Sequence, residues 1–120
     1  MIMRVLLIDV GYGYKRKFKK YLAERGKSIK IDAAVSFNRF NFYGGTGLTE
    51  IFERNNFDLY LVSHLERTYN KNIIKEALEY GCNIKQLGHD ELTPDEEGYS
   101  RLLKIIEGDA WEDFWESTNL

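Results

Sequence analysis

The two histidines of the chain, His64 and His89, each follow an apolar segment that has the length and composition of a buried β-strand. Imidazole titrates near neutral pH and ligates metal ions, so a histidine pair suits acid–base chemistry or metal binding. The spacing of the two matches no established metal-ligand motif, and the sequence therefore predicts no metal site. Polar loops without a shared function are the alternative interpretation of the same residues.

A further candidate group follows the first apolar run of the chain. Asp9 ends that run, and Gly11 and Gly13 come directly after it. Asp9 is a candidate catalytic or ligand-binding residue, and the glycines let a ligand approach the backbone closely. Ser63, at the end of another apolar run, joins these residues as a candidate ligand-binding group.

The segment 44–49 reads Gly-Gly-Thr-Gly-Leu-Thr and stands where a helix is expected to begin. Free backbone N–H groups at a helix start favour an anion, and the hydroxyls of Thr46 and Thr49 add donors beside Gly47. The segment resembles the phosphate loop of flavodoxins, but here it follows the second expected strand instead of the first. Plain capping of the helix by Thr46 is the alternative.

These residues must be positioned by strands that alternate with helices. The apolar periodicity predicts strands over 3–8, 28–37, 57–62 and 83–87, and helices over 14–25, 48–54 and 71–80. Asn70 is the expected cap of the third helix, Ile73, Ile74, Ala77 and Leu78 are its expected buried stripe, and Gly26 and Gly81 are expected helix stops. Thr93-Pro94-Asp95-Glu96 predicts a last helix that is capped by Thr93 and runs from Pro94 to about Glu107.

This alternation predicts a three-layer α/β/α domain over residues 1–108, with a mostly parallel four-stranded sheet in the order 2-1-3-4, a flavodoxin-like or Rossmann-like arrangement. Ligands of such sheets bind beyond the carboxyl ends of the strands, the edge at which Asp9, Ser63, His64 and His89 are expected. Residues 109–120 form an acidic, aromatic tail that is expected to be a short separate helix. Its Trp111, Phe114 and Trp115 either pack on the domain or bind a protein partner.

Composition narrows the classes of function further. The lone Cys82 implies a reducing compartment, and with no signal peptide or membrane span in the sequence we expect a cytoplasmic protein without a membrane partner. Residues 1–30 hold nine basic side chains against two acidic ones, whereas residues 90–120 hold ten acidic against two basic. These ends attract oppositely charged ligands or partners, or simply face each other or solvent. Basic residues are too mixed with tyrosines and acids to indicate nucleic-acid binding.

Residues 3–90 resemble the receiver domain of bacterial response regulators. The likeness rests on Ile8-Asp9 at the end of a strand, on Phe18, Leu22 and Gly26 in the first helix, and on the run from Asn56 to Val62. Receivers hold Mg²⁺ with an acidic pair and phosphorylate an Asp, but here Asp9 stands alone, Ser63 replaces the phosphorylated Asp, and no fifth strand with its Lys is found. The resemblance therefore implies a degenerate, shortened receiver without phosphotransfer.

A weaker likeness is to metal-dependent nuclease domains of the PIN/NYN type, which also begin with a strand ending in Asp. The turn from Ser63 to Glu66 lacks their usual acidic pair. The sequence thus favours a non-enzymatic, receiver-like regulatory module that binds a protein partner and needs no cofactor. The alternative is a small domain that binds or hydrolyses a phosphate-containing, nucleotide-like ligand, with Mg²⁺ as a possible cofactor.

Overall fold

A computed structural model describes residues 2–36, 47–64, 66, 68 and 72–119, with side chains described as far as residue 108. Its centre is a four-stranded sheet of β1 (Met3–Ile8), β2 (Ile29–Ala34), β3 (Leu59–Val62) and β4 (Ile84–Gln86). The strand order is β2-β1-β3-β4 and every neighbouring pair is parallel, which confirms the predicted sheet.

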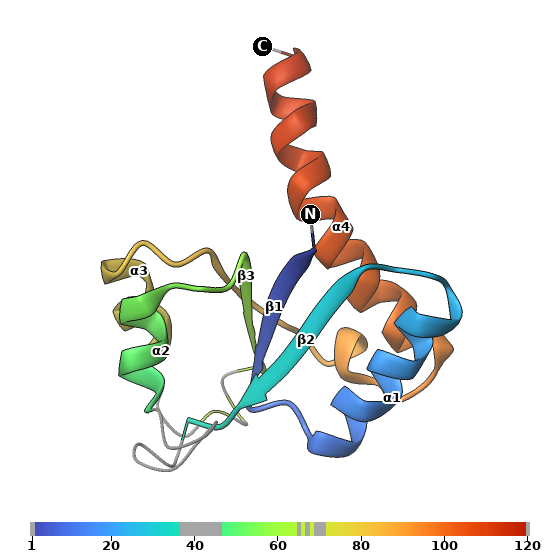
Figure 1. Cartoon of the computed structure of the whole chain (residues 1–120), viewed down its shortest axis with the longest axis horizontal. Helices are drawn as coiled ribbons and strands as arrows, with labels where there is room; N and C mark the ends of the chain where they lie inside the picture. Colours follow the sequence, from blue (N-terminus) through green and yellow to red (C-terminus); the bar gives the residue numbers. More distant parts are fainter. Residues whose placement is uncertain (1, 37–46, 65, 67, 69–71, 120) are drawn as a thin grey trace.

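Helices cover both faces of the sheet and complete the predicted three layers (Figure 1). Helices α1 (Tyr12–Glu24) and α4 (Glu96–Asn119) lie on one face, and α2 (Leu48–Arg54) and α3 (Ile73–Glu79) lie on the other. A short 3₁₀ helix, η2 (Asp90–Leu92), connects β4 to α4 and packs against α4. None of the described helices combines the length and the apolar character that crossing a bilayer requires.

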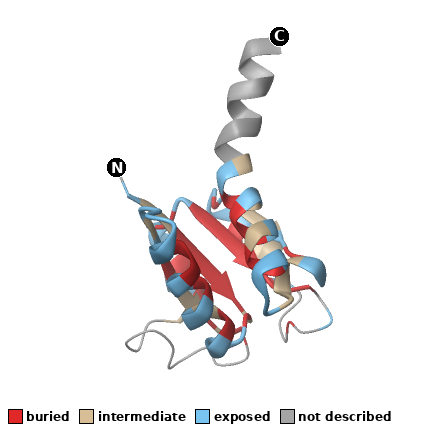
Figure 2. Ribbon diagram, turned by 90° about the vertical axis from the view of Figure 1, so that its right-hand side faces the viewer, coloured by how far each residue is buried: buried red, intermediate tan, exposed pale blue. Residues whose placement is uncertain are grey.

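The strands of the sheet are buried between two layers of helices, as Figure 2 shows. Burial of β1 on both faces accounts for its continuous apolar run. Val5 and Leu7 point into a core formed with α1 and α4, whereas Leu6 and Ile8 point into a second core formed with α2 and α3. All four side chains are fully buried. β1 is thus the central strand of the domain, and its carboxyl end is held between two packed layers.

Most predicted boundaries agree with the structure to within a few residues. The bounds of α2 are as predicted, and Gly26 and Gly81 follow α1 and α3 with φ of 64° and 77°, a left-handed conformation that favours glycine. The expected cap of α3, Asn70, lies outside the described residues. The expectation that Leu78 is buried is wrong, because its side chain is 59% exposed.

The start of α4 differs from the prediction by two residues. Thr93 does not cap the helix; instead the Asp95 carboxylate accepts a hydrogen bond from the Gly98 N–H at 2.8 Å. The Thr93 hydroxyl donates to the His89 carbonyl at 3.3 Å, and Glu96 reaches across to Arg25 at 3.1 Å. An Asp carboxylate is as good a cap as Thr, so the helix begins one residue after Asp95.

The predicted break after Gly108 is also absent, since α4 continues to Asn119. A glycine inside a helix costs only about 1 kcal/mol, too little to end a helix that the flanking residues favour. The side chains of Trp111, Phe114 and Trp115 lie outside the described part of the chain.

Candidate functional site at the carboxyl edge of the sheet

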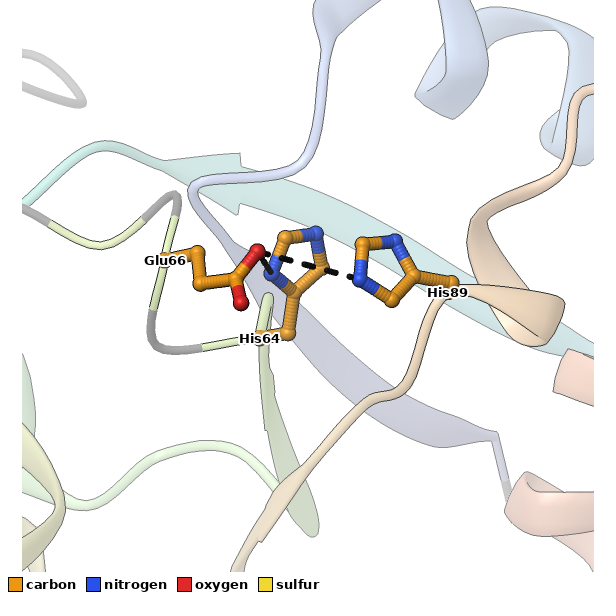
Figure 3. A group of neighbouring side chains, drawn as sticks. All are labelled: His64, Glu66 and His89. Atoms are coloured by element: carbon orange, nitrogen blue, oxygen red, sulfur yellow. Dashed lines mark ion pairs between the residues drawn. The ribbon is translucent and has the colours of Figure 1, made fainter.

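The parallel register places His64 and His89 at the same edge of the sheet. Val62 pairs with Gln86, and the Leu87 N–H donates to the Val62 carbonyl at 2.7 Å, so the loops after β3 and β4 leave side by side. The two imidazole rings lie with their centroids 4.0 Å apart and their planes inclined by 36° (Figure 3). The structure thus brings together the two histidines that the sequence singled out.

Glu66 joins both histidines through one carboxylate oxygen. Its Oε2 lies 4.0 Å from Nδ1 of His64 and 3.9 Å from Nε2 of His89. One ligand atom from each of the three side chains lies within 4.8 Å of the others. His64, Glu66 and His89 are called the His–Glu–His cluster below.

Burial differs sharply across the His–Glu–His cluster. The His64 side chain is only 10% exposed, whereas the side chains of His89 and Glu66 are 69% and 82% exposed. His64 therefore forms a fixed inner wall, and the two exposed side chains have room to change rotamer. Such a site is open to solvent on one side and accessible to a small ligand or ion.

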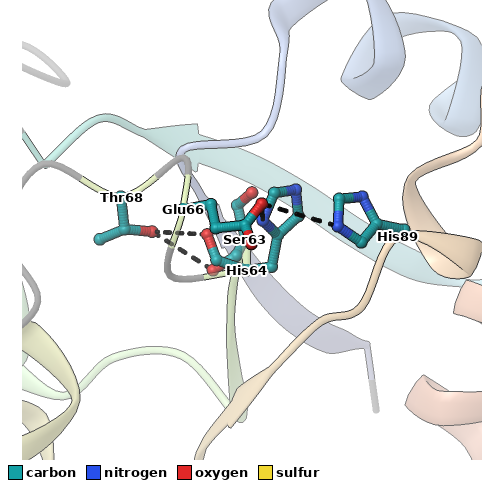
Figure 4. Close-up of polar contacts among 5 residues, drawn as sticks. All are labelled: Ser63, His64, Glu66, Thr68 and His89. Carbon is teal, nitrogen blue, oxygen red and sulfur yellow. Dashed lines mark hydrogen bonds and ion pairs between the residues drawn. The ribbon is translucent and has the colours of Figure 1, made fainter.

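Hydrogen bonds to backbone carbonyls fix the two loops that carry the cluster. The buried Thr68 hydroxyl lies 3.2 Å from the Ser63 carbonyl and 3.5 Å from the His64 carbonyl, so it ties Thr68 to the residues directly after β3 (Figure 4). On the other loop, Thr93 donates to the His89 carbonyl and the Tyr14 hydroxyl donates to the Glu91 carbonyl. Burial, followed by Tyr99 and nearby acidic groups, raises the pKa of Tyr14, so its hydroxyl keeps the proton that it donates.

Ser63 is a candidate of a different kind, because its side chain is fully buried. Its backbone N–H donates to the Ile8 carbonyl at 2.9 Å. Its hydroxyl has no hydrogen-bond partner among the described residues. Ser63 directly follows β3 and offers no exposed nucleophile.

The Asp9 carboxylate forms its hydrogen bonds with Ser36, at another place on the carboxyl edge of the sheet. Its carboxylate accepts hydrogen bonds from the Ser36 N–H, at 2.7 Å, and from the Ser36 hydroxyl. Its backbone has a φ of 59°, a left-handed conformation that Asp tolerates better than most residues. Asp9 thus links the end of β1 to the segment after β2, and its described hydrogen bonds do not join it to the histidines.

The predicted glycine and threonine ligands are spread over two helix starts. Gly11 and Gly47 occupy the positions before α1 and α2, and Gly13 lies in the first turn of α1. The Thr49 hydroxyl donates to the carboxylate of Glu76 on α3, so it joins two helices. Thr46 lies outside the described residues. These described groups thus belong to the starts of α1 and α2, whereas the histidines belong to the loops after β3 and β4.

The sequence places Glu66 among the polar residues after the third strand without naming it as a site residue, and it gives no signal for Ser36. Glu66 follows His64 by two positions in a loop directly after a strand, a spacing that lets both side chains emerge near one point. That spacing indicates a site only because the pairing of β3 with β4 brings Nε2 of His89 to 3.9 Å from Oε2 of Glu66. The pairing of Asp9 with Ser36 has no local signal, because it joins two loops 27 residues apart.

Comparison with protein-family models and with the curated proteins finds no match to this chain.

Proposed function

We propose that the protein is a small-ligand-binding domain whose site is the His–Glu–His cluster. The observation that carries the proposal is the convergence of two imidazole rings, 4.0 Å apart, from the loops after two adjacent parallel strands. The carboxyl edge of an open parallel sheet is the usual ligand site of this architecture. The exposed side chains of His89 and Glu66 leave the site open to a ligand from solvent, and the buried His64 offers that ligand a fixed contact.

Two further features support a binding role. In the loops that carry the cluster, buried or half-buried hydroxyls donate to backbone carbonyls of described residues, which holds the backbone beside the cluster in place. Two of the candidate residues offer no free nucleophile, since Ser63 is fully buried and the Asp9 carboxylate already accepts hydrogen bonds from Ser36. Binding is therefore better supported than covalent chemistry.

A thermal-shift screen of nucleotides, inorganic phosphate and divalent metal ions tests the proposal. A ligand present at 100 times its dissociation constant adds about 2.7 kcal/mol to the free energy of unfolding. We expect at least one compound to stabilise the wild type and to shift the imidazole NMR signals of both histidines. The same compound should leave His89→Ala unstabilised. A screen in which no compound moves either readout would contradict the proposal.

A second candidate function is a receiver-like regulatory module that binds a protein partner without phosphotransfer. The strand order supports it, together with the fully buried Ser63 at the position of the phosphorylated residue in receivers. Incubation with Mg²⁺ and a small phosphodonor should then leave the mass of the protein unchanged. Turnover of a phosphate ester by the purified protein, lost in His64→Ala and His89→Ala, would contradict this candidate.

A further inference from the structure

We propose that the His–Glu–His cluster binds a divalent transition-metal ion, Zn²⁺ being the best match. The inference rests on the proposed function and specifies the ligand of the same site. It assigns His64, Glu66 and His89 as three metal ligands, two through imidazole nitrogens and one through a carboxylate oxygen. An open position then faces solvent on the side of the two exposed side chains.

The spacing of the three donors suits one ion. Three atoms that all lie within 4.8 Å of one another share a point no farther than about 2.8 Å from each, whereas Zn–N and Zn–O bonds measure about 2.0–2.2 Å. The two separations from Glu66, 4.0 and 3.9 Å, exceed the roughly 3.4 Å between ligands of a tetrahedral ion by about half an ångström. The two imidazole nitrogens are bounded only by the 4.8 Å limit, so binding one ion requires the exposed Glu66 and His89 side chains to move inward by up to about 1.4 Å while the buried His64 stays in place.

The chemistry of the donors selects the class of metal. Neutral imidazole is a borderline-soft ligand that suits Zn²⁺, Fe²⁺, Co²⁺ and Ni²⁺, and two histidines with one carboxylate are a known donor set of open metal sites. Mg²⁺ prefers an all-oxygen octahedron and keeps several waters. The cluster therefore discriminates against Mg²⁺, the ion that a receiver would hold.

The carboxylate also argues for a cation in place of an anion. Glu66 lies within 4.0 Å of both imidazoles, where its negative charge opposes the binding of a phosphate directly to the histidines. The same charge stabilises a dication. A phosphate-containing ligand at this site would bind to the open position of the metal.

Isothermal titration of the untagged full chain with Zn²⁺, and separately with Mg²⁺, tests the inference. We expect one Zn²⁺ per chain, no measurable heat from Mg²⁺, and shifts of the imidazole ¹⁵N signals of both histidines. Loss of a positioning partner of a metal ligand weakens binding about 10–100-fold, so loss of a ligand itself, in His89→Ala or Glu66→Gln, should weaken it at least as much. His89 and Glu66 are exposed, so these variants should fold.

Glu53→Gln is the matched control for Glu66→Gln, because it removes the same charge from an exposed side chain of α2, on a different element. It should bind Zn²⁺ within about twofold of the wild type. Equal affinities for Glu53→Gln and Glu66→Gln would overturn the assignment of Glu66. Zn²⁺ binding that survives His89→Ala, or no Zn²⁺ binding by the wild type, would overturn the metal site.

The outcomes separate this inference from the proposed function. If Zn²⁺ fails but a nucleotide or phosphate shifts the histidine signals, the ligand is an anion and only the metal assignment falls. If no tested ion or compound moves those signals, both fall together.

Discussion

Replacing Gly98 by alanine should destabilise the protein, although alanine is the better helix former. Gly98 is buried in the first turn of α4, where its N–H donates to the Asp95 cap. A Cβ at this position would lie 1.9 Å from the backbone oxygen of Thr93 and 2.8 Å from its carbonyl carbon. The opposing atoms are backbone, so no side-chain rotation relieves the overlap.

The magnitude follows from the displacement that the methyl group requires. Ordinary van der Waals separation is about 3.5 Å, so the helix start and the Thr93 peptide must separate by more than about 1 Å. Overpacking of this kind costs about 1–3 kcal/mol, against a gain of up to about 1 kcal/mol from helix propensity. The 1.9 Å approach to backbone places this site at the upper end of that range, so we expect a net loss of about 2 kcal/mol, or about 8 °C in Tm for a chain of this size.

Gly108→Ala is the control, because Gly108 lies in the same helix and its Cβ would meet nothing within 4 Å. This substitution should stabilise the protein by about 0.5–1 kcal/mol. Urea unfolding followed by circular dichroism measures both variants, provided that their m-values agree with that of the wild type. A gain in stability for Gly98→Ala equal to that of Gly108→Ala would refute the close approach of Thr93.

The same substitution tests how the site is held. The Thr93 hydroxyl donates to the carbonyl of His89, so displacing Thr93 disturbs the loop that carries this histidine. Gly98→Ala should therefore weaken ligand binding at the His–Glu–His cluster as well, whereas Gly108→Ala should leave it unchanged.

Three other predictions concern groups outside the cluster. Asp9→Ala should cost about 2–3 kcal/mol in urea unfolding, because it removes both hydrogen bonds from Ser36 and leaves a φ of 59° that alanine adopts poorly, whereas Asp9→Asn should cost less. Burial raises the pKa of Tyr60 to about 12. The folded state thus holds this proton more tightly than the unfolded state, and the stability that this gives is intact below pH 10 and lost between about pH 10 and 12. Ellipticity and tyrosinate absorbance should therefore change together on alkaline titration. Ionisation of Tyr60 at a lower pH with unchanged ellipticity would contradict this. Burial likewise raises the pKa of the Cys82 thiol, which should react with a thiol reagent only when the chain unfolds; rapid reaction in native buffer would contradict its burial.

Much of the fold could be predicted from local patterns in the chain. The run from Met3 to Ile8 is apolar at every position but one, the pattern of a strand covered on both faces, and the alternation of such runs with amphipathic segments predicts a parallel sheet. The bounds of α2 and the glycine stops after α1 and α3 followed from propensity and conformational freedom alone.

The errors arose where tertiary contacts chose between equivalent local signals. Thr93 and Asp95 are both good caps, and the choice of Asp95 depends on the Thr93 hydroxyl being occupied by the carbonyl of His89. Leu78 has the spacing of a buried residue, yet α3 buries only a narrow stripe that includes Ile73 and Ala77. Helical periodicity predicts which side of a helix is buried, but not how many residues on that side are covered.

The His–Glu–His cluster shows the same division between local and long-range information. His64 and Glu66 are neighbours in sequence, but His89 joins them only because β3 pairs with β4 in a register that aligns Val62 with Gln86. A slip of that register by two residues would move His89 by about 7 Å along the strand direction and separate it from both partners. The packing that sets this register buries Val62 in one core and Leu87 in the other, so the position of the site is determined by both layers of the fold. A variant that loosens either core should therefore lose ligand affinity before it loses its helices, because the three donors must stay within a few ångströms of one another.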